Sequence, residues 1–369
     1  MGNAIDGCLE SCYILSKDLS KFLSEFLFEL TARQQIKEVF PMYEITEQST
    51  LREIRKIPEF QDFAPFIMFN NQAPGEDPVN PTLDPEDFTL KSSPVTGAVE
   101  GLLKLREYVQ AGIRVAYDIY SPEEKAEEPD KNNTKLIYMP GKAGAPFVLV
   151  CAGGAYATVC SFLEAFPTAK RLNDMGYNAF VLSYRVHEVP LIPKPTEDVA
   201  AALKFIFAHA DDFKVSPENY AVCGFSAGGH LTGSWGTKTL GYPRFGAKKP
   251  AALFVCYGAS RGEKPKDGKL SPFTRTMIGD NPSPEAINAI DVTANIDSDY
   301  PPTFLWHCKD DPMVPYQAAV DMNTALEKAG VPHELMLVEK GGHGIGIGDN
   351  TLAAGWLQKA VAFWQSVSK

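Results

Sequence analysis

The strongest constraint on the fold is an alternation that begins at about residue 106, where short apolar runs are followed by segments of helical pattern. Such runs are typical of strands buried on both faces of a sheet. We expect strands at 114–120, 135–138, 147–151, 179–182, 220–223, 253–257, 303–307 and 334–338, and helices at 162–175, 196–209, 318–329 and 352–367. Thr196 is expected to cap its helix, and 121–133 to form a charged surface loop. The alternation predicts an α/β fold with a mostly parallel central sheet and helices on both faces, where ligands bind beyond the carboxyl ends of the strands.

The length of the chain constrains its domains. With 369 residues it is long for one hydrophobic core and short for two complete catalytic domains. We expect a catalytic domain at 106–369, with an irregular insertion at about 260–300, and a helical and loop-rich N-terminal extension at 1–105. The extension has an amphipathic stripe at 19–30, four aromatic residues and a proline-rich stretch at 74–85. The aromatic residues are Phe60, Phe63, Phe66 and Phe69. They either pack on a flank of the catalytic domain or form a cap over the site or a dimer contact.

Charge and cysteine content exclude some classes of partner. The net charge is −11, which argues against nucleic acid because a basic surface for phosphate is missing. The seven cysteines include no C-x-x-C pair and fit free thiols in a reducing compartment. The N-terminal residues do not resemble a signal peptide, and no apolar run is long enough for a membrane span. We therefore expect a cytoplasmic protein without a membrane partner, and the sequence leaves a homo-oligomer open.

A G-x-S-x-G pentapeptide, Gly224-Phe225-Ser226-Ala227-Gly228, is the first candidate for chemistry. The pattern alone is loose, but here it follows an apolar strand directly and precedes a helix-like segment. A sharp strand-to-helix turn exposes the serine hydroxyl, and close packing of the strand on the helix leaves room only for glycine at the flanks. The context therefore favours Ser226 as a nucleophile over an incidental serine in a glycine-rich turn.

A serine hydroxyl is a poor nucleophile at neutral pH and needs a base. His343 lies in a glycine-rich loop directly after the last predicted strand, in the order along the chain that suits a base for Ser226. His230 is on the helix four residues after the serine and should point away from the site. His343 is therefore the predicted base, and His187 is a weaker competitor that we place in the pocket wall.

The third catalytic group must orient the imidazole and stabilise its charged form. Asp310 and Asp311 both follow the strand that ends at His307. The run 311–315, DPMVP, resembles the D-x-x-V-P pattern that often surrounds the acid in this kind of site, and it favours Asp311. The other aspartate is then a turn or cap residue.

The tetrahedral intermediate also needs N–H donors, which form an oxyanion hole. One donor is expected to be the backbone N–H of Ala227, the residue after the nucleophile. The second should come from the small-residue loop after the strand at 147–151, with Gly154 favoured and Gly153 as the alternative. The side chains expected to line the substrate pocket are Tyr156, Phe225 and His187.

These motifs together resemble a known group of enzymes. The resemblance rests on 151–156 (CAGGAY), 182–186 (LSYRV), 224–231 (GFSAGGHL), 311–315 (DPMVP) and 342–344 (GHG). The chain from about 110 to 369 looks like the serine esterases of the α/β-hydrolase fold, in particular acetylxylan-esterase-like, feruloyl-esterase-like and hormone-sensitive-lipase-like enzymes. The resemblance implies a triad of Ser226, Asp311 and His343 and no metal or cofactor. The chain departs from these enzymes at Ala152 and Ala155 in the oxyanion loop, although alanine keeps its backbone N–H.

Three functions are consistent with the motifs. The leading one is a serine carboxylesterase that forms an acyl-enzyme with a small-molecule ester, either a short-chain acyl or an aryl ester, on a carbohydrate or a plant phenolic. The alternative is an amide or peptide hydrolase, similar to prolyl oligopeptidase or to an arylformamidase. The last is a non-catalytic binding protein on a hydrolase fold, which a complete triad argues against.

Overall fold

The computed structural model describes residues 43–68, 87–90, 97–261 and 270–368 of the chain. The chain divides into two compact units, Met1–Glu44 and Ile45–Lys369, and the description below concerns the second. Three features singled out in the sequence lie outside the described residues: the stripe at 19–30, Phe69 and the stretch at 74–85.

The core of the second unit is an eight-stranded sheet with the strand order β1-β2-β4-β3-β5-β6-β7-β8. The strands are β1 (Ala116–Tyr117), β2 (Lys135–Met139), β3 (Phe147–Cys151), β4 (Asn178–Ser183), β5 (Ala221–Phe225), β6 (Ala252–Cys256), β7 (Thr303–Cys308) and β8 (His333–Val338). β2 pairs antiparallel with β1 and β4, and every pairing from β4 to β8 is parallel. All residues of β3, β5 and β6 are buried, as expected for strands covered on both faces.

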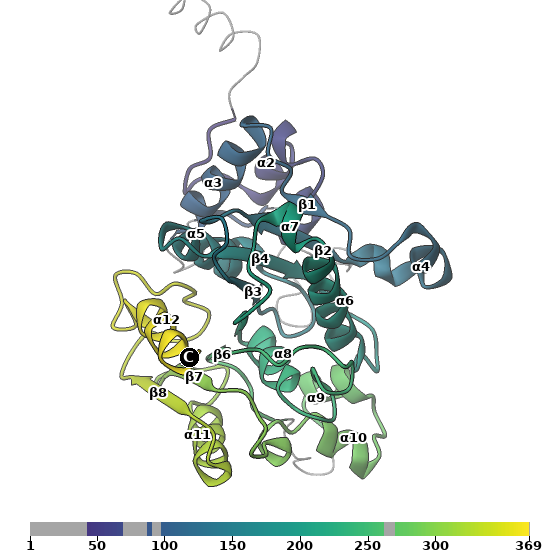
Figure 1. The fold of residues 1–369 in the computed structure, drawn as a ribbon, viewed down its shortest axis with the longest axis vertical. Helices are drawn as coiled ribbons and strands as arrows, with labels where there is room; N and C mark the ends of the chain where they lie inside the picture. Colours follow the sequence, from purple (N-terminus) through teal and green to yellow (C-terminus); the bar gives the residue numbers. More distant parts are fainter. Residues whose placement is uncertain (1–42, 69–86, 91–96, 262–269, 369) are drawn as a thin grey trace, which may run out of the picture. The chain divides into compact units, whose positions relative to one another are not determined.

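Helices lie on both sides of this sheet (Figure 1). They are α2 (Leu51–Arg55), α3 (Ala98–Gln110), α4 (Pro122–Glu127), α5 (Phe166–Asp174), α6 (Lys194–Ala208), α7 (Ala210–Phe213), α8 (Ala227–Trp235), α9 (Pro272–Ile278), α10 (Pro284–Ala289), α11 (Gln317–Ala329) and α12 (Trp356–Val367). α5 packs on β3 and β4, α8 on β5 and β6, α11 on β7 and β8, and α12 on β6 and β7. The expected mostly parallel sheet with helices on both faces is confirmed.

Two local expectations were wrong. The segment expected as a surface loop contains α4 and a 3-10 turn, η5 (Pro129–Asn133). The helix forms because Ser121 and Glu124 make a capping box and Pro122 occupies the first turn, where no N–H is needed. Thr196 does not cap α6, because the helix begins at Lys194 and the Thr196 hydroxyl donates to the Pro193 carbonyl.

The described part of the N-terminal extension joins the core of the sheet. Phe60 and Phe63 are fully buried and Phe66 is nearly so, within the same hydrophobic cluster as β3 and β5. α3 packs on α5, and at Gly101 a Cβ atom would lie 2.9 Å from the Phe166 carbonyl carbon. These three aromatic residues therefore pack on the catalytic part of the chain. The boundary drawn from the sequence between residues 105 and 106 falls inside α3.

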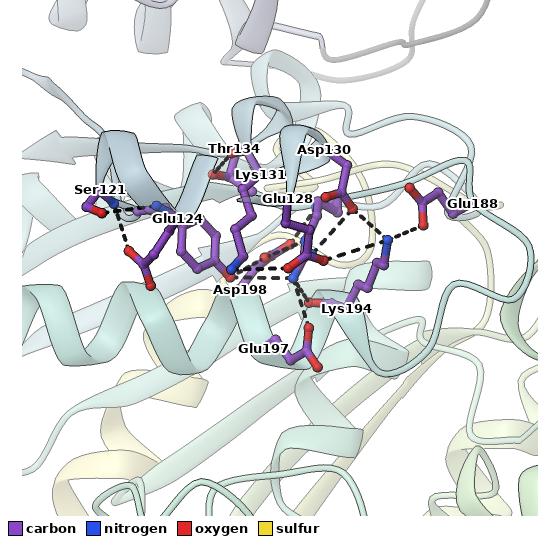
Figure 2. Close-up of polar contacts among 12 residues, drawn as sticks. Ser121, Glu124, Glu128, Asp130, Lys131, Thr134, Glu188, Lys194, Glu197 and Asp198 are labelled. Carbon is purple, nitrogen blue, oxygen red and sulfur yellow. Dashed lines mark hydrogen bonds and ion pairs between the residues drawn. The ribbon is translucent and has the colours of Figure 1, made fainter. Parts of the chain in front are cut away.

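A network of charged side chains joins the segment after β4 to η5 and α6, and Figure 2 labels Glu128, Asp130, Glu197 and Asp198 among its members. The Arg185 guanidinium, 2 % exposed, contacts four carboxylates: Glu128 and Asp130 near η5, and Glu197 and Asp198 of α6. Burial alone lowers the pKa of Arg185, but the surrounding carboxylates, Asp198 first, outweigh it and raise that pKa above its ordinary value. The network fixes the segment after β4, which leads to His187.

The described residues of the insertion contain α9, α10 and a 3-10 turn, η7 (Thr293–Asn295), in agreement with the short helical pieces expected there. α9 and α10 begin with serine caps, Ser271 and Ser283, each followed by a proline. Across the described part of the chain, no helix has both the length and the apolar character that a membrane span requires.

Candidate active site

The G-x-S-x-G segment forms the connection between β5 and α8. Ser226 adopts φ 51° and ψ −117°, a strained conformation for a residue with a side chain. The glycines are required by space: a Cβ at Gly224 would lie 2.0 Å from the Gly228 carbonyl oxygen, and one at Gly228 would lie 2.2 Å from the Cys151 carbonyl oxygen. The turn leaves Ser226 partly exposed, beyond the carboxyl end of β5.

The structure brings Ser226, His343 and Asp311 together from three separate loops. His343 Nε2 lies 2.8 Å from Ser226 Oγ, and His343 Nδ1 lies 2.7 Å from Asp311 Oδ2. Because a carboxylate oxygen can only accept, Nδ1 carries the hydrogen, and Nε2 is then the acceptor for the serine hydroxyl. This is the tautomer that a general base needs.

Asp311 is held by more than His343. Its side chain is fully buried, and Oδ1 accepts from the N–H groups of Met313 at 2.8 Å and Val314 at 2.9 Å. Oδ2 also lies 3.1 Å from Nε2 of His307, a buried residue of β7. Burial on its own raises the pKa of Asp311, but the hydrogen bonds from His307, His343 and the backbone outweigh it and hold that pKa well below its ordinary range.

Asp310 has a different place in the site. Its Oδ1 accepts from the backbone N–H groups of Gly341 and Gly342, both at 2.9 Å. Gly342 has φ 72° and Gly344 has φ 70°, so the loop that carries His343 turns through conformations that favour glycine. Asp310 therefore fastens the loop of His343, while the neighbouring aspartate contacts its ring.

In the oxyanion loop after β3, the structure distinguishes Gly153 from Gly154, the two candidate N–H donors between which the sequence did not decide. The N–H of Gly153 donates to the buried carboxylate of Glu164 at 2.6 Å, so it is directed away from a substrate. Gly154 has φ 136°, and a Cβ there would lie 2.1 Å from the Thr158 carbonyl oxygen. Ala227 is the first residue of α8, where the backbone N–H has no partner within the helix. The geometry disfavours Gly153 as a donor and leaves Gly154 and Ala227.

Two of the three residues expected in the pocket wall lie in the core. Phe225 is fully buried against Tyr257 and Trp356, because the strand carries its side chain into the packed interior. Tyr156 is also fully buried, and its hydroxyl lies 2.9 Å from His230 Nδ1. A side chain without accessible surface cannot line an open pocket, so these two assignments were wrong. His187 is partly exposed, and its backbone N–H donates to the Tyr156 carbonyl at 3.2 Å.

Sequence reasoning missed three polar residues of the site: Glu164, Tyr257 and His307. Glu164 lies in an apolar helical segment and is buried. The only signal in the sequence was an acidic residue among the apolar neighbours Phe162, Leu163 and Ala165. Nothing in the sequence pattern marked Tyr257 or His307, because each lies in or next to an apolar strand and faces the site only through the register of the sheet.

Within 43–68, 87–90, 97–261 and 270–368, no group of three or more His, Cys, Asp or Glu side chains could hold a metal ion. The cysteines in these ranges are Cys151, Cys160, Cys223, Cys256 and Cys308. Burial raises the pKa of Cys151 and Cys256 well above the ordinary value, so both remain neutral thiols.

Comparisons with known families agree with this architecture. The chain has the α/β-hydrolase fold, as predicted. The BD-FAE family model matches residues 136–242, and the model of the prolyl oligopeptidase family matches residues 194–369. The two matches overlap and together cover the sheet from β2 onward.

Curated relatives and solved structures point to the same group. Endo-1,4-beta-xylanase B of Butyrivibrio fibrisolvens is 27 % identical over 57 % of this chain and 34 % of its own length. Acetylxylan esterase of Xylanibacter ruminicola is 25 % identical over 58 % of this chain and 44 % of its own length. The probable carboxylic ester hydrolase LipM of Mycobacterium tuberculosis is 29 % identical over 47 % and 43 %. The chain thus spans less than half the length of these relatives.

Among solved structures, the acetyl ester-xyloside bifunctional hydrolase from Caldicellulosiruptor lactoaceticus is 27 % identical, with a TM-score of 0.59 over 68 % of this chain and 96 % of that chain. The carboxylesterase Cest-2923 from Lactobacillus plantarum shares the fold at 20 % identity, with a TM-score of 0.54 over 63 % and 92 %. The predicted resemblance to acetylxylan-esterase-like α/β-hydrolases is confirmed.

Proposed function

We propose that this protein is a serine carboxylic-ester hydrolase that acts through an acyl-enzyme. The observation that carries the proposal is the hydrogen-bonded series Ser226–His343–Asp311, with contacts of 2.8 Å and 2.7 Å at the carboxyl edge of the sheet. The relatives support it, because their names are those of acetylxylan and carboxylic ester hydrolases. No metal or cofactor is required for this chemistry.

In the acylation step, Ser226 Oγ attacks the carbonyl carbon of the ester while His343 Nε2 takes the hydroxyl proton. Asp311 keeps Nδ1 protonated and stabilises the imidazolium that forms. The negative oxygen of the tetrahedral intermediate is bound by the N–H groups of Gly154 and Ala227. Removing one such donor typically costs about 10²- to 10³-fold in kcat. The intermediate collapses when the bond to the alcohol breaks, and the alcohol leaves with the proton from His343.

Deacylation repeats the same geometry with water. His343 Nε2 takes a proton from a water molecule, whose oxygen attacks the acyl carbon of the Ser226 ester. The second tetrahedral intermediate uses the same two N–H donors and collapses to the carboxylic acid. The proton returns to Ser226 Oγ, which regenerates the enzyme.

The substrate class we propose is a short-chain acyl or aryl ester, linked to a carbohydrate or a plant phenolic. Support for a carbohydrate comes from the relatives named for acetylxylan and for acetyl ester-xyloside hydrolysis. The phenolic part of the proposal rests on the resemblance to feruloyl-esterase-like enzymes alone.

An amide or peptide hydrolase is the second candidate, and one observation favours it: the prolyl oligopeptidase family model matches residues 194–369, which include Ser226, Asp311 and His343. An arylformamidase would use the same groups. A panel of acetyl, butyryl, octanoyl and feruloyl esters together with a peptide anilide separates the two. A higher kcat/KM for the anilide than for every ester would replace the first proposal by the second.

The test of the catalytic assignment is hydrolysis of p-nitrophenyl acetate or butyrate by the wild type and by Ser226→Ala. We expect hydrolysis by the wild type and its loss in the variant, since the acyl-enzyme cannot form. Wild-type rates in the variant would show that Ser226 is not the nucleophile. An inactive wild type across the whole panel would favour the third reading, a non-catalytic binding protein.

A cytoplasmic location remains a prediction from the sequence, which leaves a homo-oligomeric state open. Fractionation of the producing cells tests the first, and light scattering of the purified chain tests the second. Neither outcome alters the assignment of Ser226.

A further inference from the structure

A buried carboxylate that the proposed mechanism does not use lies beneath the oxyanion loop. Glu164 belongs to η6 (Ser161–Ala165), a π-helical turn that leads into α5, and it is 4 % exposed. Within the described residues it forms no ion pair with Lys or Arg, although a buried acid without a cation is costly. Its partners are instead a backbone N–H and a tyrosine hydroxyl.

Glu164 accepts hydrogen bonds from two donors, the Gly153 N–H and the Tyr257 hydroxyl, and fixes the direction of both. Oε2 accepts from the Gly153 N–H at 2.6 Å, and Oε1 accepts from the Tyr257 hydroxyl at 2.7 Å. The Tyr257 oxygen in turn accepts from the Gly346 N–H at 2.9 Å, so its own hydrogen must point to Glu164. Both carboxylate oxygens are therefore acceptors, which is the pattern of the ionised form.

Through Gly153 this carboxylate sets the orientation of the oxyanion loop. The peptide that joins Ala152 to Gly153 is held at both ends, because the Tyr184 hydroxyl donates to the Ala152 carbonyl at 2.7 Å while Glu164 accepts the N–H. In the next peptide, the Gly153 carbonyl accepts from the Cys160 N–H at 2.9 Å. Since the N–H of a trans peptide points opposite to its carbonyl, the Gly154 N–H is turned away from Cys160.

Through Tyr257 the same carboxylate reaches the loop of His343. Gly346, whose N–H the Tyr257 hydroxyl accepts, lies three residues after His343. The Tyr257 ring also packs edge-on against the His343 ring, with centroids 5.0 Å apart. One carboxylate therefore connects the loop that holds the oxyanion donor with the loop that holds the base.

The charge of Glu164 also acts on His343. Burial raises the pKa of Glu164, and the hydrogen bonds from Gly153 and Tyr257 and the positive charge of a protonated His343 lower it in part. The Glu164 anion also attracts the positive charge that His343 acquires when it takes the proton of Ser226.

Other titratable groups face these two residues from the elements packed against them. Tyr184 follows β4, Cys256 ends β6 and Tyr257 follows it, and burial raises the pKa of all three well above ordinary values, so they stay neutral. Asp311 carries the negative charge on the other side of the His343 ring, and His307 faces Asp311 from β7.

We infer that Glu164 is a positioning residue of the active site, which orients the oxyanion donor through Gly153, fastens the loop of His343 through Tyr257 and supports the protonated base by its charge. The inference rests on the proposed function. It assigns to one carboxylate a role in two separate catalytic loops.

The test compares the wild type, Glu164→Gln and the matched control Glu107→Gln on p-nitrophenyl acetate between pH 5 and 9. Glutamine has one acceptor oxygen, so either Gly153 or Tyr257 loses its acceptor, and the negative charge is removed. We expect kcat to fall about 10- to 10²-fold with KM changed less than about 3-fold, because an oxyanion donor out of position acts on the transition state. The acid limb of the kcat/KM profile should move to lower pH, because a positive charge in the site loses the anion that stabilises it.

The control makes the same chemical change at an exposed glutamate of α3, whose side chain is 66 % exposed, and it should leave both readouts as in the wild type. An active wild type with unchanged kcat and acid limb in Glu164→Gln overturns the inference alone. The inference is also overturned if kcat falls only in proportion to the loss of folded protein, as measured by thermal unfolding, and the acid limb stays in place. A merely structural role of Glu164 would give that result. An inactive wild type overturns the proposed function, and this role with it.

If Glu164→Gln does not fold, Tyr257→Phe takes its place. This variant keeps the ring that packs on His343 and removes only the hydroxyl between Glu164 and Gly346. We expect kcat to fall roughly tenfold at unchanged KM, because the loop of His343 loses its fastening. Wild-type kcat in a folded Tyr257→Phe overturns the connection between the two loops.

Discussion

Replacing Asp311 by asparagine separates its two functions, because its two oxygens have different partners. Oδ1 accepts the Met313 and Val314 N–H groups, and Oδ2 accepts from His343 and His307. An asparagine can present its oxygen to only one of these pairs. Its NH₂ group, which can only donate, must then face the other pair, and both members of that pair are donors in the wild type.

Both orientations of the amide harm catalysis. If the oxygen stays with the backbone, the NH₂ group faces His343 Nδ1 and favours the tautomer with hydrogen on Nε2, which cannot accept the serine proton. In a comparable triad this change costs about 10⁴-fold in kcat. If the amide is flipped so that its oxygen faces His343, the two backbone N–H groups lose their acceptor, which costs about 1–3 kcal/mol for each group. This catalytically competent orientation is therefore populated about 30- to 10⁴-fold less than the other. We therefore expect kcat of Asp311→Asn to fall about 10²- to 10⁴-fold at nearly unchanged KM.

The neighbouring aspartate supplies the matched control. Asp310 is exposed and uses Oδ1 alone to accept from Gly341 and Gly342, a role that an asparagine oxygen can fill. Asp310→Asn should keep kcat within about threefold of the wild type, since the hydrogen bonds survive. The assay is initial-rate hydrolysis of p-nitrophenyl acetate, with circular dichroism to verify the fold. A loss below tenfold in Asp311→Asn, or an equal loss in Asp310→Asn, would refute this reasoning.

Three further predictions concern stability and the turn at Ser226. Arg185→Met should lower the free energy of unfolding by about 3–5 kcal/mol in urea titrations, because the fully buried Asp198 loses its cation; a change below about 1 kcal/mol would contradict this. Since the pKa of Asp311 is lowered by folding, its contribution to stability is fully present above the unfolded-state pKa of about 3.9 and is lost as the pH falls through the folded-state pKa. The difference in unfolding free energy between wild type and Asp311→Asn should therefore shrink below about pH 4, and a difference that grows there would be incompatible. Gly228→Ala should cost at least about 1–3 kcal/mol and most of the activity, because its Cβ would lie 2.2 Å from the Cys151 carbonyl oxygen; a stable and active variant in thermal unfolding and ester assays would disagree.

The sheet was predictable from sequence where burial on both faces leaves a simple pattern. The run at Phe147–Cys151 is apolar throughout and forms β3 with the expected bounds. The short β1 shows the limit: residues 114–120 have the composition of a strand, yet only Ala116–Tyr117 pair, with β2, at the edge of the sheet. The charged composition of 121–133 predicts a loop, yet α4 forms there because Ser121 and Glu124 make a capping box, a pattern that is visible in the sequence.

For the site, chain order and motif spacing were enough to single out Ser226, Asp311 and His343, which the structure brings within hydrogen-bond distance. The walls of the site were not predictable in the same way. Phe225 alternates with its neighbours along β5 and enters the core, a direction that depends on the register of the strand. Gly153 and Gly154 have the same residue type, and only the tertiary position of Glu164 separates them.

The three carboxylates around the site share one physical task. Loops at the carboxyl edge of a parallel sheet contain backbone N–H groups that no strand or helix pairs, and each such group needs an acceptor. Here Glu164 accepts from Gly153, Asp310 accepts from the loop of His343, and Asp311 accepts from its own turn. Folding lowers the pKa of Asp311 and burial raises that of Glu164, so acid protonates Glu164 first. As the pH falls, the oxyanion loop therefore loses its charged acceptor while Asp311 still holds the ring of His343.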